Sequence, residues 1–223
     1  MKYVSVEPKN SCKMLSEERL NQNYLMFINR LEKYGCKSET LLDELGEKIK
    51  YASYSRNEED GGCYQGSLVD VTLNRLCKLG YQLNENVFGG NGKETAQHPF
   101  LYCDSKSLMK VLLLLNLSKA EMYEPETEQW KLKKGMLFRF SDTLCATLKV
   151  GARTLYLCQK HGIKLTEEEY EAILFFDAED DTVPDKFRNP LCMVARMAVA
   201  FTAVELRQIY LDNNRLNNNE IEK

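Results

Sequence analysis

The chain has 223 residues, of which 43% are hydrophobic and 28% are charged, and its 30 basic and 33 acidic side chains give a formal net charge of −3. This composition is typical of a globular protein and excludes wholesale disorder, and the length suits one domain. Because the net charge is slightly negative, no global positive field is available to hold nucleic acid through its phosphates.

Two amphipathic helices are predicted near the N-terminus. Residues 16–34 carry apolar side chains at helical spacing, with a serine at the start, two glutamates in the first turn and a glycine just beyond the end. Residues 38–50 also begin at a serine and carry a second apolar stripe. The stretch 51–66 is rich in Ser, Asn, Asp and Gly, which predicts a loop.

Two more helices are predicted in the middle of the chain. Residues 67–79 carry leucine and valine at helical spacing, and Gly80 is the predicted stop. The glycine-rich residues 86–93 lack the GxxxxGK[ST] spacing of a phosphate-binding loop, and no apolar strand precedes them, so we expect a surface loop. Residues 105–117 are apolar on almost every side, which predicts the central buried helix.

The C-terminal half predicts a hairpin followed by three helices. Residues 130–140 contain a Lys-Gly turn between short alternating runs, which predicts a small β-hairpin. Helices are then expected over about 142–161, 166–176 and 190–211, the second with a capping box. We therefore predict an all-α, irregular helical bundle with a small β-hairpin insertion. It forms a single domain over residues 1–211, with N-terminal helices 16–50, a core over 67–206 and a polar, flexible tail over 212–223.

The chain carries no signal for membranes or for export. No apolar run approaches the roughly 20 residues that a membrane-spanning helix needs, and the N-terminal residues lack the apolar centre of a secretion signal. The eight cysteines are scattered without close pairs, which is typical of buried thiols in a reducing compartment. We expect a cytoplasmic protein with no membrane partner and no cofactor.

Four segments resemble, in one consistent order, the motifs of a known enzyme family. Residues 51–76 resemble a loop followed by GGLxEHSL, and residues 112–125 resemble LLHDLCKANFY. Residues 148–176, which contain KHGIKLTEEEYEAI, resemble GHGEKSVYLLxRxGLxLTxEExxAIRWH, and residues 189–201 resemble LALLLHIADMLA. These are motifs of the HD-domain phosphohydrolases of bacteria and phages. The resemblance implies an HD-domain-like helical fold, in which histidines and aspartates hold one or two divalent metals that activate a water against phosphorus.

The metal-binding positions of that family are changed in this chain. By the same alignment, the ligand positions fall on Val71, Leu115, Asn116, Val150, Phe176 and Arg196. Five of these side chains cannot ligate a divalent ion, and an asparagine alone is a weak oxygen ligand. A shift of one residue would bring in Asp70 and Asp177, but it turns a helical side chain by about 100°, away from a shared centre. The resemblance thus implies a pseudoenzyme with an apolar centre, no catalytic residue and no metal site.

Three cations remain near that centre. In the alignment, Lys119 follows the former His-Asp pair, Arg153 replaces the lysine of GHGEK, and Arg196 stands where the family has its last aspartate. Together they would form an anion pocket, because guanidinium groups bind phosphate without a metal. The alternative is that all three lie on solvated faces or pair with acids such as Glu121.

Other reactive side chains have simpler interpretations. His161 precedes a predicted helix end at Gly162, where a partly cationic ring interacts favourably with the helix dipole. His98 lies in a loop before a proline. Cys158 and His161 are three residues apart, but nothing else suggests a nucleophilic site. The acidic residues 177–185 lack the oxygen spacing of a calcium-binding loop.

The sequence favours a catalytically inactive HD-like protein that acts by binding a protein partner or by self-assembly. We expect a phage structural (virion) component or a host-interacting protein, located in the host cytoplasm or the virion, with the aromatics near Trp130 as the contact surface. Two alternatives stay open. One is a module that binds or sequesters a nucleotide or another phosphate ligand through Lys119, Arg153 and Arg196. The other is an HD phosphohydrolase with an altered metal site.

Overall fold

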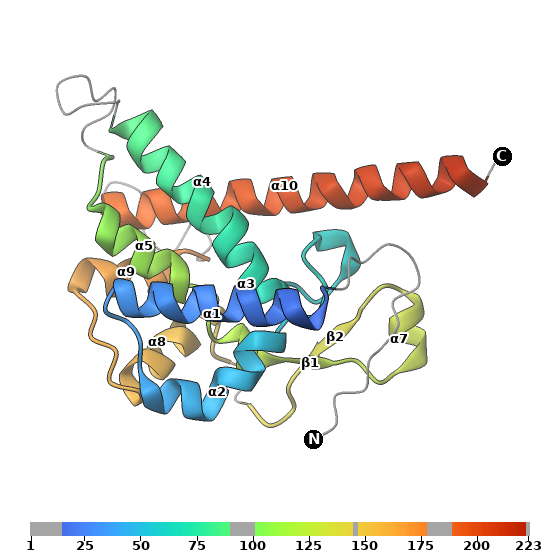
Figure 1. The fold of residues 1–223 in the computed structure, drawn as a ribbon, viewed down its shortest axis with the longest axis horizontal. Helices are drawn as coiled ribbons and strands as arrows, with labels where there is room; N and C mark the ends of the chain where they lie inside the picture. The colour runs from blue at the N-terminus through green and yellow to red at the C-terminus, as the bar shows by residue number, and fades with distance from the viewer. Residues whose placement is uncertain (1–14, 90–100, 145–146, 178–188, 222–223) are drawn as a thin grey trace.

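Helices make up most of the structure, and a small two-stranded antiparallel sheet lies at one side of them (Figure 1). The computed structural model describes residues 15–89, 101–144, 147–177 and 189–221. The predicted all-α class with a small β-hairpin is confirmed. None of the helices within these ranges is long and apolar enough to cross a membrane.

Two helices of 17 and 13 residues begin the described part of the chain, most elements in its central part are short, and one long helix closes it. In chain order the elements are α1 (Glu17–Lys33), α2 (Glu39–Tyr51), the 3-10 helix η1 (Glu58–Asp60), α3 (Ser67–Val71), the π-helical η2 (Thr72–Leu76), α4 (Cys77–Gln82), the π-helical η3 (Leu83–Phe88), α5 (Ser105–Leu114), α6 (Lys119–Met122), β1 (Tyr123–Pro125), α7 (Gln129–Lys133), β2 (Phe138–Phe140), α8 (Val150–Lys160), α9 (Glu167–Phe175) and α10 (Pro190–Ile221).

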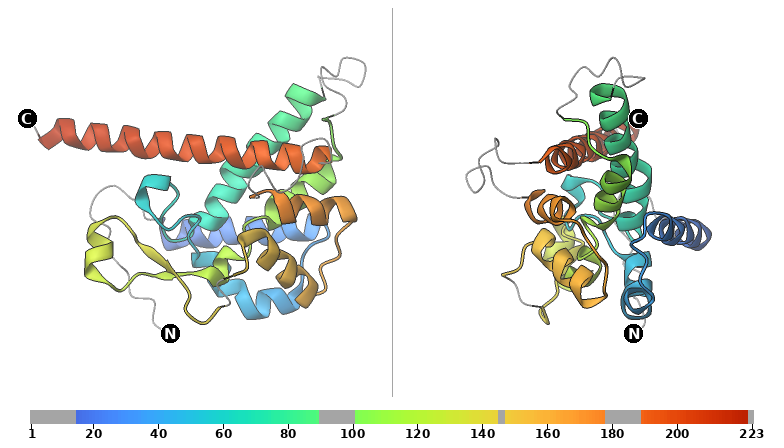
Figure 2. Two further views of the ribbon diagram at one scale, coloured as in Figure 1. Left: turned by 180° about the vertical axis from the view of Figure 1, so that it is seen from behind. Right: turned by 90° about the vertical axis from the view of Figure 1, so that its left-hand side faces the viewer.

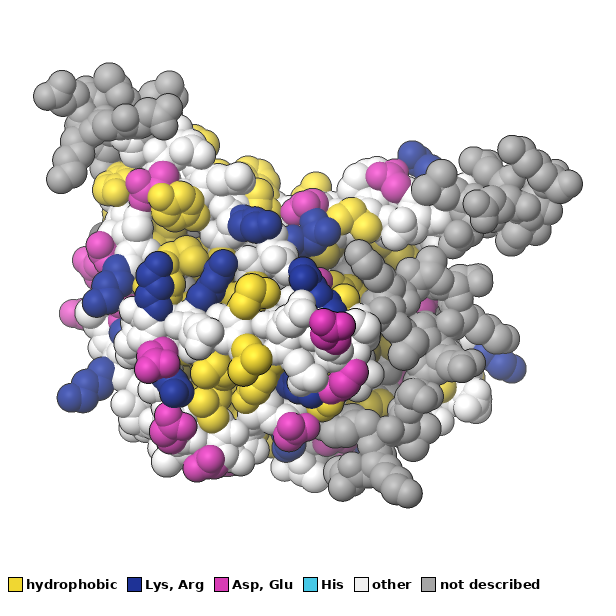
Figure 3. Space-filling view, in the orientation of Figure 1, with side chains coloured by type: hydrophobic (Ala, Val, Ile, Leu, Met, Phe, Trp, Pro, Cys, Tyr) yellow, Lys and Arg dark blue, Asp and Glu magenta, His cyan; other side chains and the backbone are white. Residues whose placement is uncertain are grey.

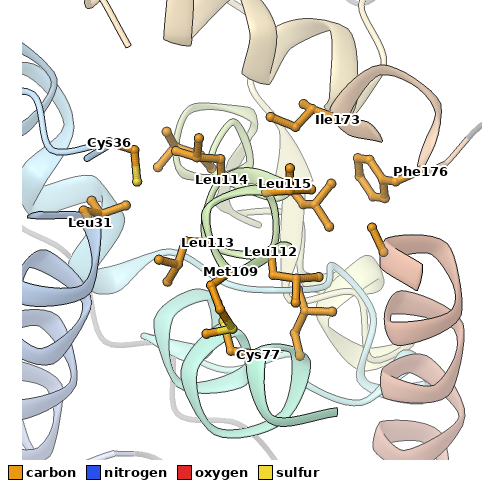
Figure 4. Packing of buried hydrophobic residues seen from close by; sticks show 14 of the residues in the cluster. Leu31, Cys36, Cys77, Met109, Leu112, Leu113, Leu114, Leu115, Ile173 and Phe176 are labelled. Carbon is orange, nitrogen blue, oxygen red and sulfur yellow. The ribbon is translucent and has the colours of Figure 1, made fainter. Parts of the chain in front are cut away.

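Helix α5 lies at the centre of the bundle. Between Leu108 and Leu115 every side chain except that of Lys110 is buried. Helices α1, α4, α9 and α10 pack around it (Figures 1 and 2), and the close-up in Figure 4 shows apolar side chains on several sides of α5 meeting those of its neighbours. Removing this many leucines from water is the main favourable contribution to folding, so the apolar run predicts the position of the core.

Two helix starts follow the local signals in the sequence. The Ser16 hydroxyl accepts a hydrogen bond from the backbone N–H of Arg19 at the start of α1. At α9, Thr166 Oγ1 accepts from the backbone N–H of Glu169 at 3.2 Å, and Glu169 Oε2 accepts from the backbone N–H of Thr166 at 3.0 Å. The predicted capping box is therefore confirmed, because two N–H groups at this helix start have side-chain partners.

The predicted stop at Gly80 is wrong. The helical path that begins at Ser67 runs through Gly80 and continues to Phe88, with π-helical turns in η2 and η3. A Cβ on Gly80 would lie only 2.3 Å from Leu112 Cδ1, so the glycine permits the close approach of α4 and α5. Its role is packing between helices, which a local stop signal does not distinguish. Of the glycine-rich segment 86–93, residues 90–93 lie outside the described residues.

The hairpin uses a partner strand that the sequence did not indicate. Strand β1 pairs with β2 in the register Tyr123↔Phe140, and the residues around Trp130 form the short helix α7 between the two strands. The helix expected from residue 142 begins at Val150. Ser141 explains part of this delay, because its N–H donates to the Met122 carbonyl and its hydroxyl donates to Glu124, which prolongs the strand pairing.

Helix α10 crosses the bundle and extends well beyond it (Figures 1 and 2). It begins at Pro190, and Asn189 Oδ1 accepts from the Cys192 N–H at 2.8 Å, as the predicted cap requires. We expected the helix to end at Leu211, but it continues through Ile221. The buried side chain of Leu206 marks the point after which α10 leaves the bundle.

Candidate functional site

Four of the six positions that the resemblance assigns to metal ligands are part of the apolar interior. Val71 and Leu115 are fully buried and Phe176 is 7% exposed, and all three belong to the same hydrophobic cluster, against which Val150 packs. Figure 4 shows Leu115 and Phe176 near one another, on the side of α5 that faces Ile173 of α9. The described residues contain no group of three or more His, Cys, Asp or Glu side chains placed to hold a metal ion.

Tyr54, which no sequence pattern singled out, belongs to the same hydrophobic cluster. Its side chain is buried, and burial raises its pKa, an effect that the nearby Asn116 amide opposes. A Cβ on Gly62 would contact both Tyr54 and Val71, so the ring lies close to one of the positions that the resemblance assigns to metal ligands. Asn116 is itself 2% exposed, and its Nδ2 has no hydrogen-bond partner among the residues that the structure describes.

Lys119 lies against the Tyr54 ring. Its Nζ is 4.1 Å from the ring centroid and donates a hydrogen bond of 2.8 Å to the Tyr54 carbonyl oxygen. Burial of the ammonium lowers the pKa of Lys119 to about 8, although the carboxylates of Asp177 and Asp60 act in the opposite direction. Within the described ranges, this lysine has no carboxylate close enough for an ion pair.

The structure does not bring the three predicted cations into one pocket. Lys119 lines a groove beside α10, whereas Arg153 lines a separate cavity and lies 3.8 Å from the Glu121 carboxylate. Arg196 lines neither space and donates to the Phe175 carbonyl oxygen at 3.4 Å. The pairing of Arg153 with Glu121 matches the alternative in which these side chains have structural partners.

The cavity beside Arg153 is mostly apolar and has a volume of about 330 Å³. Burial raises the pKa of Asp177 at its wall, while the charges of Lys149 and Lys119 act to lower it. The cavity is lined by Met122, Phe140, Ser141, Leu144, Leu148, Lys149, Val150, Arg153 and Asp177.

The groove is larger, about 490 Å³, and more polar. One wall of the groove is α10. The opposite wall is formed by residues 54–56, which follow α2, together with η1, the first residue of α6 and the strands β1 and β2. Gly61 adopts φ +67° and lies against α10, where a Cβ would be 2.4 Å from the Leu206 carbonyl oxygen. This close approach holds η1 against the helix. The groove is lined by Tyr54, Ser55, Arg56, Asp60, Lys119, Tyr123, Phe140, Ala203, Val204, Leu206 and Arg207.

The two aspartates of the shifted alignment do not meet. Asp70 accepts hydrogen bonds from Asn23 Nδ2, the Tyr64 hydroxyl and Asn74 Nδ2, at distances of 2.7 to 3.0 Å. These contacts tie α3 to α1 and to the loop before it. Asp177, by contrast, lies at the wall of the 330 Å³ cavity.

The remaining candidates have structural surroundings. Cys158 is buried, and burial raises the pKa of its thiol to about 12, which disfavours the thiolate that a nucleophile requires. His161 follows α8 as its C-cap residue, and its Nδ1 lies 3.1 Å from Thr40 Oγ1. His98 and residues 178–185 of the acidic stretch lie outside the described residues.

Comparisons of the chain with protein-family models, with curated proteins and with solved structures find no match. The HD-domain resemblance therefore rests on the four sequence segments alone.

Proposed function

We propose that this chain is a non-catalytic, HD-like helical protein that works by binding another macromolecule. The observation that supports this most is the burial of Val71, Leu115 and Phe176 in one hydrophobic cluster, at the positions where the resemblance would place metal ligands. Hydrocarbon side chains offer no lone pair to a divalent ion. A packed apolar centre stabilises the fold without a metal.

Exposed aromatic side chains near the hairpin supply a surface for such binding. Trp130 on α7 is 54% exposed, and the ammonium groups of Lys131 and Lys134 lie 5.5 and 5.1 Å from its ring. Phe140 on β2 is 47% exposed. Tryptophan and other large aromatics are enriched among the residues that dominate protein interfaces.

Metal analysis of the purified protein, together with a phosphodiesterase assay in manganese, tests this proposal. We expect no stoichiometric metal and no hydrolysis, because the centre holds aliphatic and aromatic side chains. Stoichiometric manganese or iron, or hydrolysis that a chelator abolishes, would overturn the proposal and favour a hydrolase with an altered metal site.

A phosphate-ligand module is the second candidate, and the lysine without an ion-pair carboxylate among the described residues favours it. A nucleotide phosphate beside Lys119 would neutralise a buried positive charge. A thermal-shift screen with nucleotides and inorganic phosphate separates the candidates. A shift that is lost in Lys119→Met supports the phosphate-ligand module, and the absence of any shift removes it.

A further inference from the structure

The groove beside α10 carries positive charge that the protein as a whole does not. Its lining includes three cations, Arg56, Lys119 and Arg207, and one carboxylate, Asp60, in a chain whose formal net charge is −3. None of the three cations forms an ion pair with a residue that the structure describes. Asp60 accepts a hydrogen bond from Asn57 Nδ2 at 3.3 Å. The groove therefore presents a local positive surface that complements an acidic ligand.

Two of the three positive groups rest on aromatic rings. The Arg56 guanidinium carbon lies 4.0 Å from the centroid of Phe140, and Lys119 Nζ lies 4.1 Å from that of Tyr54. Tyr123 in turn meets Phe140 edge to face, with centroids 5.6 Å apart. Because Arg56 and Lys119 rest on different rings, their charges are fixed at two separate places before any ligand binds.

Apolar side chains border the same groove. Val204 of α10 is 69% exposed and Phe140 is 47% exposed, and both contribute to its lining. The ribbon views place the two-stranded sheet and η1 on the same side of α10 (Figures 1 and 2). On the face drawn in Figure 3, apolar side chains also lie between charged ones. A surface that mixes exposed apolar groups with fixed cations is typical of protein interfaces.

We propose that the groove binds an acidic segment of a protein partner, with the partner's carboxylates beside Arg56, Lys119 and Arg207 and its apolar side chains on Val204 and Phe140. This inference rests on the proposed binding function and names the chemistry of the partner. A small phosphate ligand fits less well, because Arg56 and Lys119 sit on separate rings and a large part of the lining is apolar.

Selection from a display library of short random peptides tests the inference without assuming a sequence. The full chain is the bait, and enriched peptides are synthesised and measured by fluorescence anisotropy. We expect enrichment of Asp and Glu together with Leu, Phe or Trp, and binding that weakens with salt. Replacing the peptide's acids by Asn and Gln should weaken binding about tenfold or more.

Matched variants locate the binding site. The double variant Arg56→Gln/Arg207→Gln should weaken peptide binding about tenfold. Arg215→Gln, the control for Arg207→Gln alone, removes one positive charge from α10 outside the groove and should leave affinity unchanged, since Arg215 is exposed and lies 3.9 Å from Asp212. Circular dichroism checks folding, and Arg207→Gln alone replaces the double variant if Arg56→Gln unfolds the chain.

Three outcomes would overturn the inference. They are enriched peptides without acidic residues, equal binding by the wild-type chain and the groove variants, and displacement of the peptide by adenosine monophosphate or inorganic phosphate. The last result would assign the groove to a small phosphate ligand. None of them depends on the metal analysis, so a failed inference about the groove remains distinguishable from a failed proposal of a non-catalytic protein.

Discussion

Replacing Lys119 by methionine should change how the stability of the protein depends on pH. In the folded protein, burial lowers the pKa of Lys119 to about 8 from an ordinary value of 10.5. Between these two values the unfolded chain binds a proton that the folded chain does not, so the free energy of unfolding rises with pH across this window. Below about pH 8 the wild-type chain bears the full cost of the buried charge, which is at most about 3 kcal/mol because part of the residue touches solvent.

Urea unfolding of wild-type protein and Lys119→Met at about pH 7 and pH 10 measures this effect. The variant loses the hydrogen bond to the Tyr54 carbonyl, which lowers its stability equally at both pH values. The difference between the two proteins should therefore move by about 2–3 kcal/mol in favour of the wild-type chain at high pH.

Buried cysteines act in the opposite direction, but they cancel in the comparison. Burial raises the pKa of several thiols to about 12, so both proteins lose stability as the unfolded chain's thiols ionise above their ordinary value of 9.0. Lys134→Met, which removes an exposed lysine near Trp130, is the control and should differ from wild type by the same amount at both pH values. If the free energy of unfolding of Lys119→Met also differs from that of the wild type by the same amount at both pH values, the reasoning is refuted and the wild-type Lys119 ammonium is hydrated.

Three further predictions concern packing and burial. Gly80→Ala should lower the free energy of unfolding by about 1–3 kcal/mol, because its Cβ would lie 2.3 Å from Cδ1 of the fully buried Leu112. Leu112→Val in the same chain should relieve part of this loss. If the losses of the two substitutions simply add, the clash between the new Cβ and Leu112 is not the cause. Lys110→Met should cost about 3 kcal/mol in thermal unfolding, since it leaves the Glu169 carboxylate, 4% exposed and 2.7 Å from Lys110 Nζ, without its ion-pair partner. Lys110→Met/Glu169→Gln should recover much of this loss, and no recovery would show that the loss arises elsewhere. Iodoacetamide should modify Cys158 far more slowly in the native protein than in urea, because burial raises the pKa of its thiol to about 12. Peptide mapping by mass spectrometry measures the two rates, and equal rates would mean that the thiol is accessible in the native protein.

Local signals in the sequence predicted the elements whose causes are local. The capping box at Thr166 and the serine at the start of α1 fix helix ends through groups three residues apart. The apolar run of α5 likewise predicted the core, because a helix that is hydrophobic on almost every side has to be buried.

Sequence patterns did not predict the features that depend on contacts between residues far apart in the chain. Gly80 reads as a helix stop, yet its function depends on Leu112, which lies on another helix. Strand β1 has only three residues and becomes a strand by pairing with β2. The pattern around a hairpin turn does not reveal a partner that lies beyond an intervening helix.

The groove could not be found from the sequence for the same reason. Tyr54 and Arg56 lie in an irregular stretch without periodicity, and Arg207 follows them by about 150 residues in the chain. The motif alignment grouped Lys119 with Arg153 and Arg196, whereas the fold places it beside Arg56 and Arg207. The alignment compares positions along helices, and it contains no information on the loop that packs against α10.

The unsupported part of α10 turns a small motion into a large one. Among the residues of α10 whose side chains the structure describes, Leu206 is the last buried one, and the roughly 15 residues from there to Ile221 make an arm of about 22 Å. A tilt of about 5° at the root would carry the far end through about 2 Å. Ala203 and Arg207 line the groove at the base of this arm. A ligand in the groove would therefore also restrict the tilt of α10 and the displacement of its C-terminal end.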